Sequence, residues 1–200
     1  MSKDITATVS DIKLELRANM NGVASAAMRQ TADYRVNFGV ELPRLQAIAA
    51  EYQPDHELAN ALWKENVREC RILATLLMPR EGFDTDLCDA WAEDIKTTEL
   101  AQIFALYLVR HMSYASRKAF EWVACDRLTL RILGYATMCH VLRQTELNGR
   151  SAEELLDHLA CDIQTGERTL QAAAAKTLQI YSQLGANQKR QAKKIADYLF

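Results

Sequence analysis

The strongest constraint on the fold of this chain is a pattern of paired helices that recurs along it. Two stretches show the recurrence most clearly, "CRILATLLM" at 70–78 and "LRILGYATM" at 130–138. Each carries Arg-Ile-Leu followed by a small residue, and each is preceded by a tryptophan, Trp63 or Trp122. Because both stretches have helical hydrophobic spacing, the echo indicates corresponding positions in two units of one repeat.

The spacing of the helix pairs supports this interpretation. The first helices of the pairs are predicted to start near Asp55, Asp84, Tyr114 and Ser151, at intervals of 29, 30 and 37 residues. Two helices per unit at intervals in this range are the signature of an α-solenoid, and the small number of Gly (7) and Pro (3) residues favours helices with short connections. We therefore predict an all-α fold, a curved α-solenoid of about six antiparallel helix pairs, built as a single domain over residues 1–200.

Particular residues predict where helices begin and end. Pro43 suits a first helical turn, and Asp55 is a candidate N-cap. Ser151 and Glu154 have the spacing of a capping box, which predicts a helix start at Ser151. Gly185 is expected to end the preceding helix at its C′ position.

The repeat also accounts for the tryptophans. Trp63, Trp91 and Trp122 each lie near the end of a first helix, so we predict that they belong to the core rather than stack on a ligand. The small residue of each echo, Ala74 or Gly134, would allow the backbones of neighbouring helices to approach closely.

Charge and cysteine content limit the classes of function. The net charge of −2 argues against a generally basic nucleic-acid binder but leaves room for a local basic face. Five cysteines without a Cys-x-x-Cys pair read as reduced thiols, which predicts a cytoplasmic location. The N-terminus has no apolar signal segment, and apolar runs such as 103–109 are too short to span a bilayer, so no membrane partner is expected.

The sequence carries no convincing metal, cofactor or nucleophile motif. His158 and Cys161 have helix-face spacing but no second ligand pair, and Cys139 and His140 are adjacent and point apart on a helix. Phosphate-cradling Gly-rich loops and a G-x-S-x-G element are absent from the sequence. We therefore predict no metal and no cofactor.

Residues 37–78 carry a family resemblance. The matching elements are Phe38-Gly39-Val40, Pro43, Leu45, Ile48-Ala49, Glu57-Leu58-Ala59, Leu62-Trp63 and Glu69-Cys70-Arg71-Ile72-Leu73-Ala74. This pattern resembles the DNA alkylation repair family of HEAT-like repeat proteins over about 35–80, and the helix pairs extend the resemblance to the C-terminus.

The resemblance implies a curved all-α solenoid whose concave face binds alkylated duplex DNA. Characterised members of the family are glycosylases that release N3- or N7-alkylated purines. An alkylated purine is already a cationic leaving group, so the family relies on a carboxylate for the developing sugar cation, aromatic faces for the base and arginine for phosphates.

The catalytic stretch is where this chain departs from the family. Active members carry a Trp-Asp-x-x-Asp-like stretch at the second helix of the third pair, which corresponds here to residues 95–108. The Trp position falls near Leu100 and the catalytic Asp position near Phe104, and residues 95–108 contain no Asp. Glu99 is the only acid there and is a weak catalytic candidate, more simply explained as an acid favoured by the helix dipole. Arg131 is the nearest match to the family's functional arginine and is the other weak catalytic candidate.

The candidate nucleic-acid-binding residues are cations at or near the predicted second helices. They are Arg127, Arg131, Arg168 and Lys176. They belong to a wider stripe that also includes Arg68, Arg71, Arg110, His111, Arg117, Lys118 and Arg143. Such a stripe suits a phosphate backbone, and ordinary solvated surface charge explains it equally well. The Glu69-x-Arg71 element is predicted to form a structural ion pair, Arg68 or Arg71 pairing with an acid of an adjacent helix.

Two functions therefore remain open from the sequence. The first is a DNA alkylation repair-like protein that binds DNA on a concave basic face, with doubtful glycosylase activity toward N3- or N7-alkylated purines. The second is a non-catalytic helical-repeat scaffold for a protein partner, which predicts a concave face that is neutral or acidic and apolar. The sign of the charge on that face separates the two.

Overall fold

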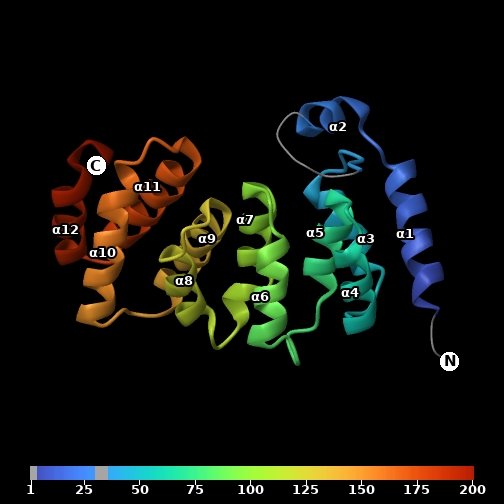
Figure 1. Cartoon of the computed structure of the whole chain (residues 1–200), viewed down its shortest axis with the longest axis horizontal. Helices are drawn as coiled ribbons and strands as arrows, with labels where there is room; N and C mark the ends of the chain where they lie inside the picture. Colours follow the sequence, from blue (N-terminus) through green and yellow to red (C-terminus); the bar gives the residue numbers. More distant parts are fainter. Residues whose placement is uncertain (1–3, 30–35) are drawn as a thin grey trace. The chain divides into compact units, whose positions relative to one another are not determined.

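A computed structural model describes residues 4–29 and 36–200. In these ranges the chain forms twelve α-helices and two short 3-10 helices, and the one β feature is an isolated bridge between Val36 and Val67 (Figure 1). The all-α prediction is confirmed. The chain divides into two compact units, one up to Trp91 and the other from Ala92 to Phe200. The expectation of a single domain stays a prediction.

Six helices begin in the first unit. They are α1 (Ile5–Ala18), α2 (Gly22–Arg29), α3 (Leu42–Ala50), α4 (His56–Lys64), α5 (Arg68–Leu77) and α6 (Thr85–Asp94). Helix α4 packs on α5, α1 packs on α4, and α3 packs on α5. Trp63 stacks on Trp91 with ring centroids 4.1 Å apart, and the edge of Phe83 meets Trp91 at 5.5 Å. All three tryptophans of the chain are buried, as predicted.

A buried carboxylate holds the loop before α3 against α5. The side chain of Glu69 accepts hydrogen bonds from the backbone N–H groups of Phe38 (3.2 Å), Gly39 (2.9 Å) and Val40 (3.3 Å). Arg68 pairs with the same carboxylate at 2.9 Å and donates to the carbonyl of Val40. Gly39 has φ +69°, a conformation that suits glycine.

This clamp gives the Glu69-x-Arg71 element a structural role, as predicted. Within the clamp, Arg68 pairs with its chain neighbour Glu69. Arg71 is also buried, and its guanidinium lies 5.5 Å from the ring centroid of Trp63. A cation over an aromatic face is favourable, so Arg71 contributes to the packing of α5 on α4.

The second unit contains the remaining helices. They are α7 (Thr98–Tyr107), the 3-10 helix η1 (Val109–His111), α8 (Ala115–Val123), α9 (Leu128–Gln144), α10 (Gly149–Ile163), α11 (Arg168–Ser182), α12 (Ala186–Ala196) and η2 (Asp197–Leu199). Helix α9 lies at the centre, packed against α7, α8 and α11, while α10 packs on α11 and α12 packs on both (Figure 1).

The two echoed stretches occupy corresponding second helices, α5 and α9, and their small residues are fully enclosed. Ala74 is completely buried. A Cβ added to Gly134 would lie 2.7 Å from the backbone nitrogen of Val123 and 2.9 Å from the carbonyl oxygen of Ala119. The backbones of α8 and α9 therefore approach each other as closely as the sequence predicted.

Two of the predicted helix ends are correct and two are wrong. Asp55 caps α4 by accepting from the backbone N–H of Leu58, and a proline occupies the first turn of α3. Helix α10, however, begins at Gly149, because Asn148 accepts from the backbone N–H of Ser151 and caps the helix in place of a Ser151 capping box. Gly185 is the N-cap of α12, not the C′ residue of α11, which ends earlier at Ser182.

Within residues 4–29 and 36–200, no helix combines the length and the apolarity needed to cross a membrane.

Candidate nucleic-acid interface

A groove runs over the second helices of the C-terminal unit. Its lining residues come from α9 and from α7 and α11, which both pack directly against α9. The volume of the groove is about 210 Å³. Its lining residues are Gln102, Leu106, Ile132, Ala136, Cys139, His140, Arg143, Ala173 and Lys176. We call this feature the α9 groove.

The field inside the α9 groove is positive. His140 is half-buried in it, and the pKa of its imidazole is lowered to about 4, with burial as the largest cause. Arg110, Arg143, Lys176 and His111 lower this pKa further, in that order, by like-charge repulsion. His140 is therefore neutral at pH 7, while Arg143 and Lys176 are exposed at the groove and carry their charge.

Arg131 has a buried acid as its partner. Its guanidinium pairs with the carboxylate of Asp162 on α10, which also accepts a 2.6 Å hydrogen bond from the hydroxyl of Tyr135. Burial and the hydrogen bond to Asp162 raise the pKa of Tyr135 well above its ordinary value. The Arg131 side chain is 27% exposed, whereas the Asp162 side chain is 3% exposed. This arrangement ties α9 to α10, and it does not place Arg131 among the residues that line the α9 groove.

The other predicted nucleic-acid contacts differ in their surroundings. Arg127 is the N-cap residue of α9 and pairs with the carboxylate of Glu93, and it also donates to the backbone carbonyl of Glu93 at 2.8 Å. Arg168 is exposed at the start of α11, outside the groove lining. Lys176 lines the α9 groove. Of the four predicted residues, the structure brings only Lys176 into this groove.

The residues that the sequence places nearest to the family's catalytic positions belong to the core of the second unit. Leu100 and Phe104 on α7 are completely buried. Glu99 is exposed in the first turn of α7, next to the N-cap Thr97, whose hydroxyl accepts from the backbone N–H of Leu100. This location agrees with the interpretation of Glu99 as an acid that stabilises the positive end of the helix dipole.

Part of the wider basic stripe is occupied by local ion pairs. Arg117 and Lys118 both contact the carboxylate of Glu121 at 2.7 Å, and both lower the pKa of that carboxyl. Their spacing from Glu121 on one helix could have shown this from the sequence.

The structure places two residues in the α9 groove, Arg143 and His140, that the sequence does not select as candidates. In the sequence Arg143 is one member of the wide basic stripe, and His140 stands out only as the neighbour of Cys139. Ala136, His140 and Arg143 lie four and three residues apart, so they share one face of α9. That spacing, with Lys176 on the neighbouring helix, is the signal that could have identified the groove.

Comparison with known proteins gives one family and one fold neighbour. The family model described as "DNA alkylation repair enzyme" matches residues 12–192. A solved structure from "a new family of proteins related to the HEAT-like repeat DNA glycosylases with affinity for branched DNA structures" superposes with a TM-score of 0.84 at 16% sequence identity. The superposition covers 95% of this chain and 82% of the chain of the solved structure. Among curated proteins, no sequence matches the chain. At this identity the superposition establishes a HEAT-like repeat fold.

Proposed function

The chain belongs to the DNA alkylation repair enzyme family, and from this premise we propose that it is a cytoplasmic DNA-binding protein whose contact surface is the α9 groove. We further propose that it binds without excising bases. The HEAT-like fold neighbour comes from a family with affinity for branched DNA structures, so branched DNA is the first ligand class to test for this chain.

The observation that carries the proposal is the charge of the α9 groove. Arg143 and Lys176 are exposed there, and neither has an acid within ion-pair distance among the described residues. The pKa of His140 is lowered first by burial, and Arg143 and Lys176 are among the cations that lower it further. Cations without a protein partner are available to neutralise phosphates and release their counterions. The alternative of a protein scaffold predicts a neutral or acidic face, which this groove does not have.

The residues on α7 support the proposed absence of catalysis. The family's glycosylases use a carboxylate near the sugar, and the corresponding positions in this chain are the buried apolar side chains of Leu100 and Phe104. The acid nearest in sequence, Glu99, sits in the first turn of α7, one turn or more before Phe104. Arg131, the other catalytic candidate, pairs with Asp162. Without a carboxylate to stabilise the sugar cation, we expect no acceleration of purine release.

The proposal is tested by two assays on the same preparation. DNA binding is measured by fluorescence anisotropy with a duplex and a four-way junction at 50 and 200 mM salt, and base release is measured with DNA containing 7-methylguanine. We expect salt-sensitive binding and no release above that of buffer. Release of 7-methylguanine that disappears in a Glu99→Gln variant would contradict the non-catalytic proposal, and absence of salt-sensitive DNA binding would contradict the whole of it.

A further inference from the structure

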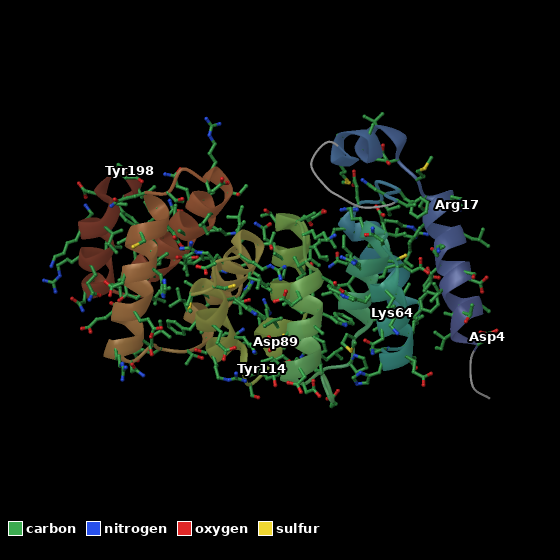
Figure 2. All side chains as sticks on the ribbon, in the orientation of Figure 1. Asp4, Arg17, Lys64, Asp89, Tyr114 and Tyr198 are labelled. Atoms are coloured by element: carbon green, nitrogen blue, oxygen red, sulfur yellow. The ribbon has the colours of Figure 1, made fainter. Side chains whose placement is uncertain are left out.

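The first unit contains a second basic hollow, made of residues that do not belong to the α9 groove. It lies beside α1, the C-terminal end of α4 and the bridge between Val36 and Val67, and its volume is about 490 Å³. Arg17 in the last turn of α1 and Lys64 in the last turn of α4 line it. Figure 2 shows Arg17 at the end of α1 that is farther from Asp4. We call this feature the α1–α4 hollow.

The charges of the α1–α4 hollow do not cancel. Its one carboxylate, Glu65, forms an ion pair with Lys13 at 3.0 Å. Arg17 and Lys64 are both exposed, and the described residues provide no acid within ion-pair distance of either. The hollow therefore carries two cations in excess of its acids.

The dipoles of α1 and α4 give a simpler reason for each cation separately. A positive side chain in the last turn of a helix is favourable without any ligand. That reason does not explain why the C-terminal turns of two different helices line the same hollow, or why its only acid pairs with the third cation. The arrangement has the composition of a surface that binds an anion from outside the chain.

The chemistry of the lining favours a nucleic-acid backbone over a single small anion. The two unpaired cations come from separate helices, so they suit successive phosphates of a strand. An arginine can donate two parallel hydrogen bonds to one phosphate, and a lysine supplies a point charge to another. The exposed amide of Asn66 adds a neutral donor.

We propose that the α1–α4 hollow is a second contact for the phosphate backbone of nucleic acid, with Arg17 and Lys64 as its phosphate-binding residues. The proposal rests on the proposed function, since it requires that the chain binds DNA. It goes further by assigning a DNA contact to the first unit. With one backbone contact in each unit, the chain would hold DNA at more than one place.

The first test compares three variants by anisotropy with junction DNA between 50 and 200 mM salt. They are Arg17→Ala/Lys64→Ala, the groove variant Arg143→Ala/Lys176→Ala, and Arg80→Ala as the matched control, because Arg80 is an exposed cation of the same unit outside the hollow. Each phosphate contact contributes a slope of about −0.9 in log K against log salt. Between 50 and 200 mM salt, the affinity of wild type should therefore fall by a factor roughly twelvefold larger than the affinity of the hollow variant. Arg80→Ala should behave as wild type.

The outcomes separate the two proposals. If wild type binds, the groove variant weakens binding and the hollow variant matches Arg80→Ala, this inference is overturned while the proposed function stands. If wild type shows no salt-sensitive binding, the proposed function fails first. A shallower salt slope for both double variants, with Arg80→Ala unchanged, supports both proposals.

The second test needs no variant and distinguishes DNA from a small anion. Acetylation of Lys64 in the wild-type protein is followed by mass spectrometry with junction DNA, with inorganic phosphate at the same phosphate concentration, or with neither. The proposal expects DNA to slow acetylation of Lys64 at least threefold and inorganic phosphate to leave it unchanged. Protection by neither ligand, or equal protection by both, overturns a backbone contact at this hollow.

Discussion

Replacing Arg131 by methionine tests whether this arginine holds the second unit together. The carboxylate of Asp162 is almost fully buried, and its two hydrogen-bond donors in the structure are the Arg131 guanidinium and the Tyr135 hydroxyl. Arg131→Met leaves a buried carboxylate with one neutral donor. Breaking a buried ion pair from one side typically costs about 3–5 kcal/mol. Because the Arg131 side chain is 27% exposed, water screens the pair, and we expect a loss of about 2–3 kcal/mol in the free energy of unfolding.

The assay is urea unfolding followed by circular dichroism, arranged as a double-mutant cycle with Asp162→Asn. An asparagine at 162 can still accept from Tyr135 and carries no charge, so the double variant should recover about 1 kcal/mol or more of the loss. DNA affinity of Arg131→Met should remain within about twofold of wild type, since removal of a phosphate contact would change the salt slope by about 0.9. A stable Arg131→Met variant with a shallower salt slope would refute this reasoning and return Arg131 to the DNA interface.

Three further predictions concern the fold and the α9 groove. Gly134→Ala should lower the free energy of unfolding, measured in urea, by about 1–3 kcal/mol because its Cβ would meet the backbone of Val123. A Cβ added at Gly149 would have no heavy atom within 4 Å, so Gly149→Ala should change the free energy of unfolding by less than about 1 kcal/mol. Equal effects of the two substitutions would contradict the close approach of α8 and α9. The folded-state pKa of His140 lies near 4, below the ordinary 6.5, so between these two pH values the unfolded chain takes up a proton that the folded chain does not. The contribution of this group to stability should therefore be complete above pH 6.5 and be lost as the pH falls toward 4. In urea titrations, the free energy of unfolding should depend less steeply on pH for His140→Gln than for wild type. Glu69→Gln should lower the free energy of unfolding by about 3 kcal/mol or more, because it removes the buried ion pair between Arg68 and Glu69, and a thermal shift of less than about 2 °C would argue against the clamp.

The sequence predicted the architecture well because that architecture is repetitive. The two Arg-Ile-Leu echoes lie in second helices α5 and α9, and the tryptophans that precede them are buried. Helix ends were predicted less reliably, because competing caps lie close together in the chain. Asn148 and Ser151 are both good N-cap residues, and which of them caps α10 depends on the path of the chain before the helix.

The candidate site was harder to predict because the sequence does not reveal partners across helices. Arg127 and Arg131 are cations at or near a predicted second helix, but Glu93 lies 34 residues from the first and Asp162 lies 31 residues from the second. Neither pairing leaves a signal in local spacing. The sequence predicts Lys176 as a DNA contact because it lies on a second helix. Arg143 becomes a candidate only when α9 and α11 are known to pack side by side, because the two cations then line the same groove.

The most direct test of the central claim is the affinity of wild-type protein and the Arg143→Ala/Lys176→Ala variant for a labelled DNA junction at two salt concentrations. If the α9 groove is the DNA contact surface, the double variant should bind more weakly at 50 mM salt, and its slope of log K against log salt should be shallower than that of wild type by about 1.8. Identical affinities and slopes for the two proteins would contradict the assignment of DNA binding to this groove.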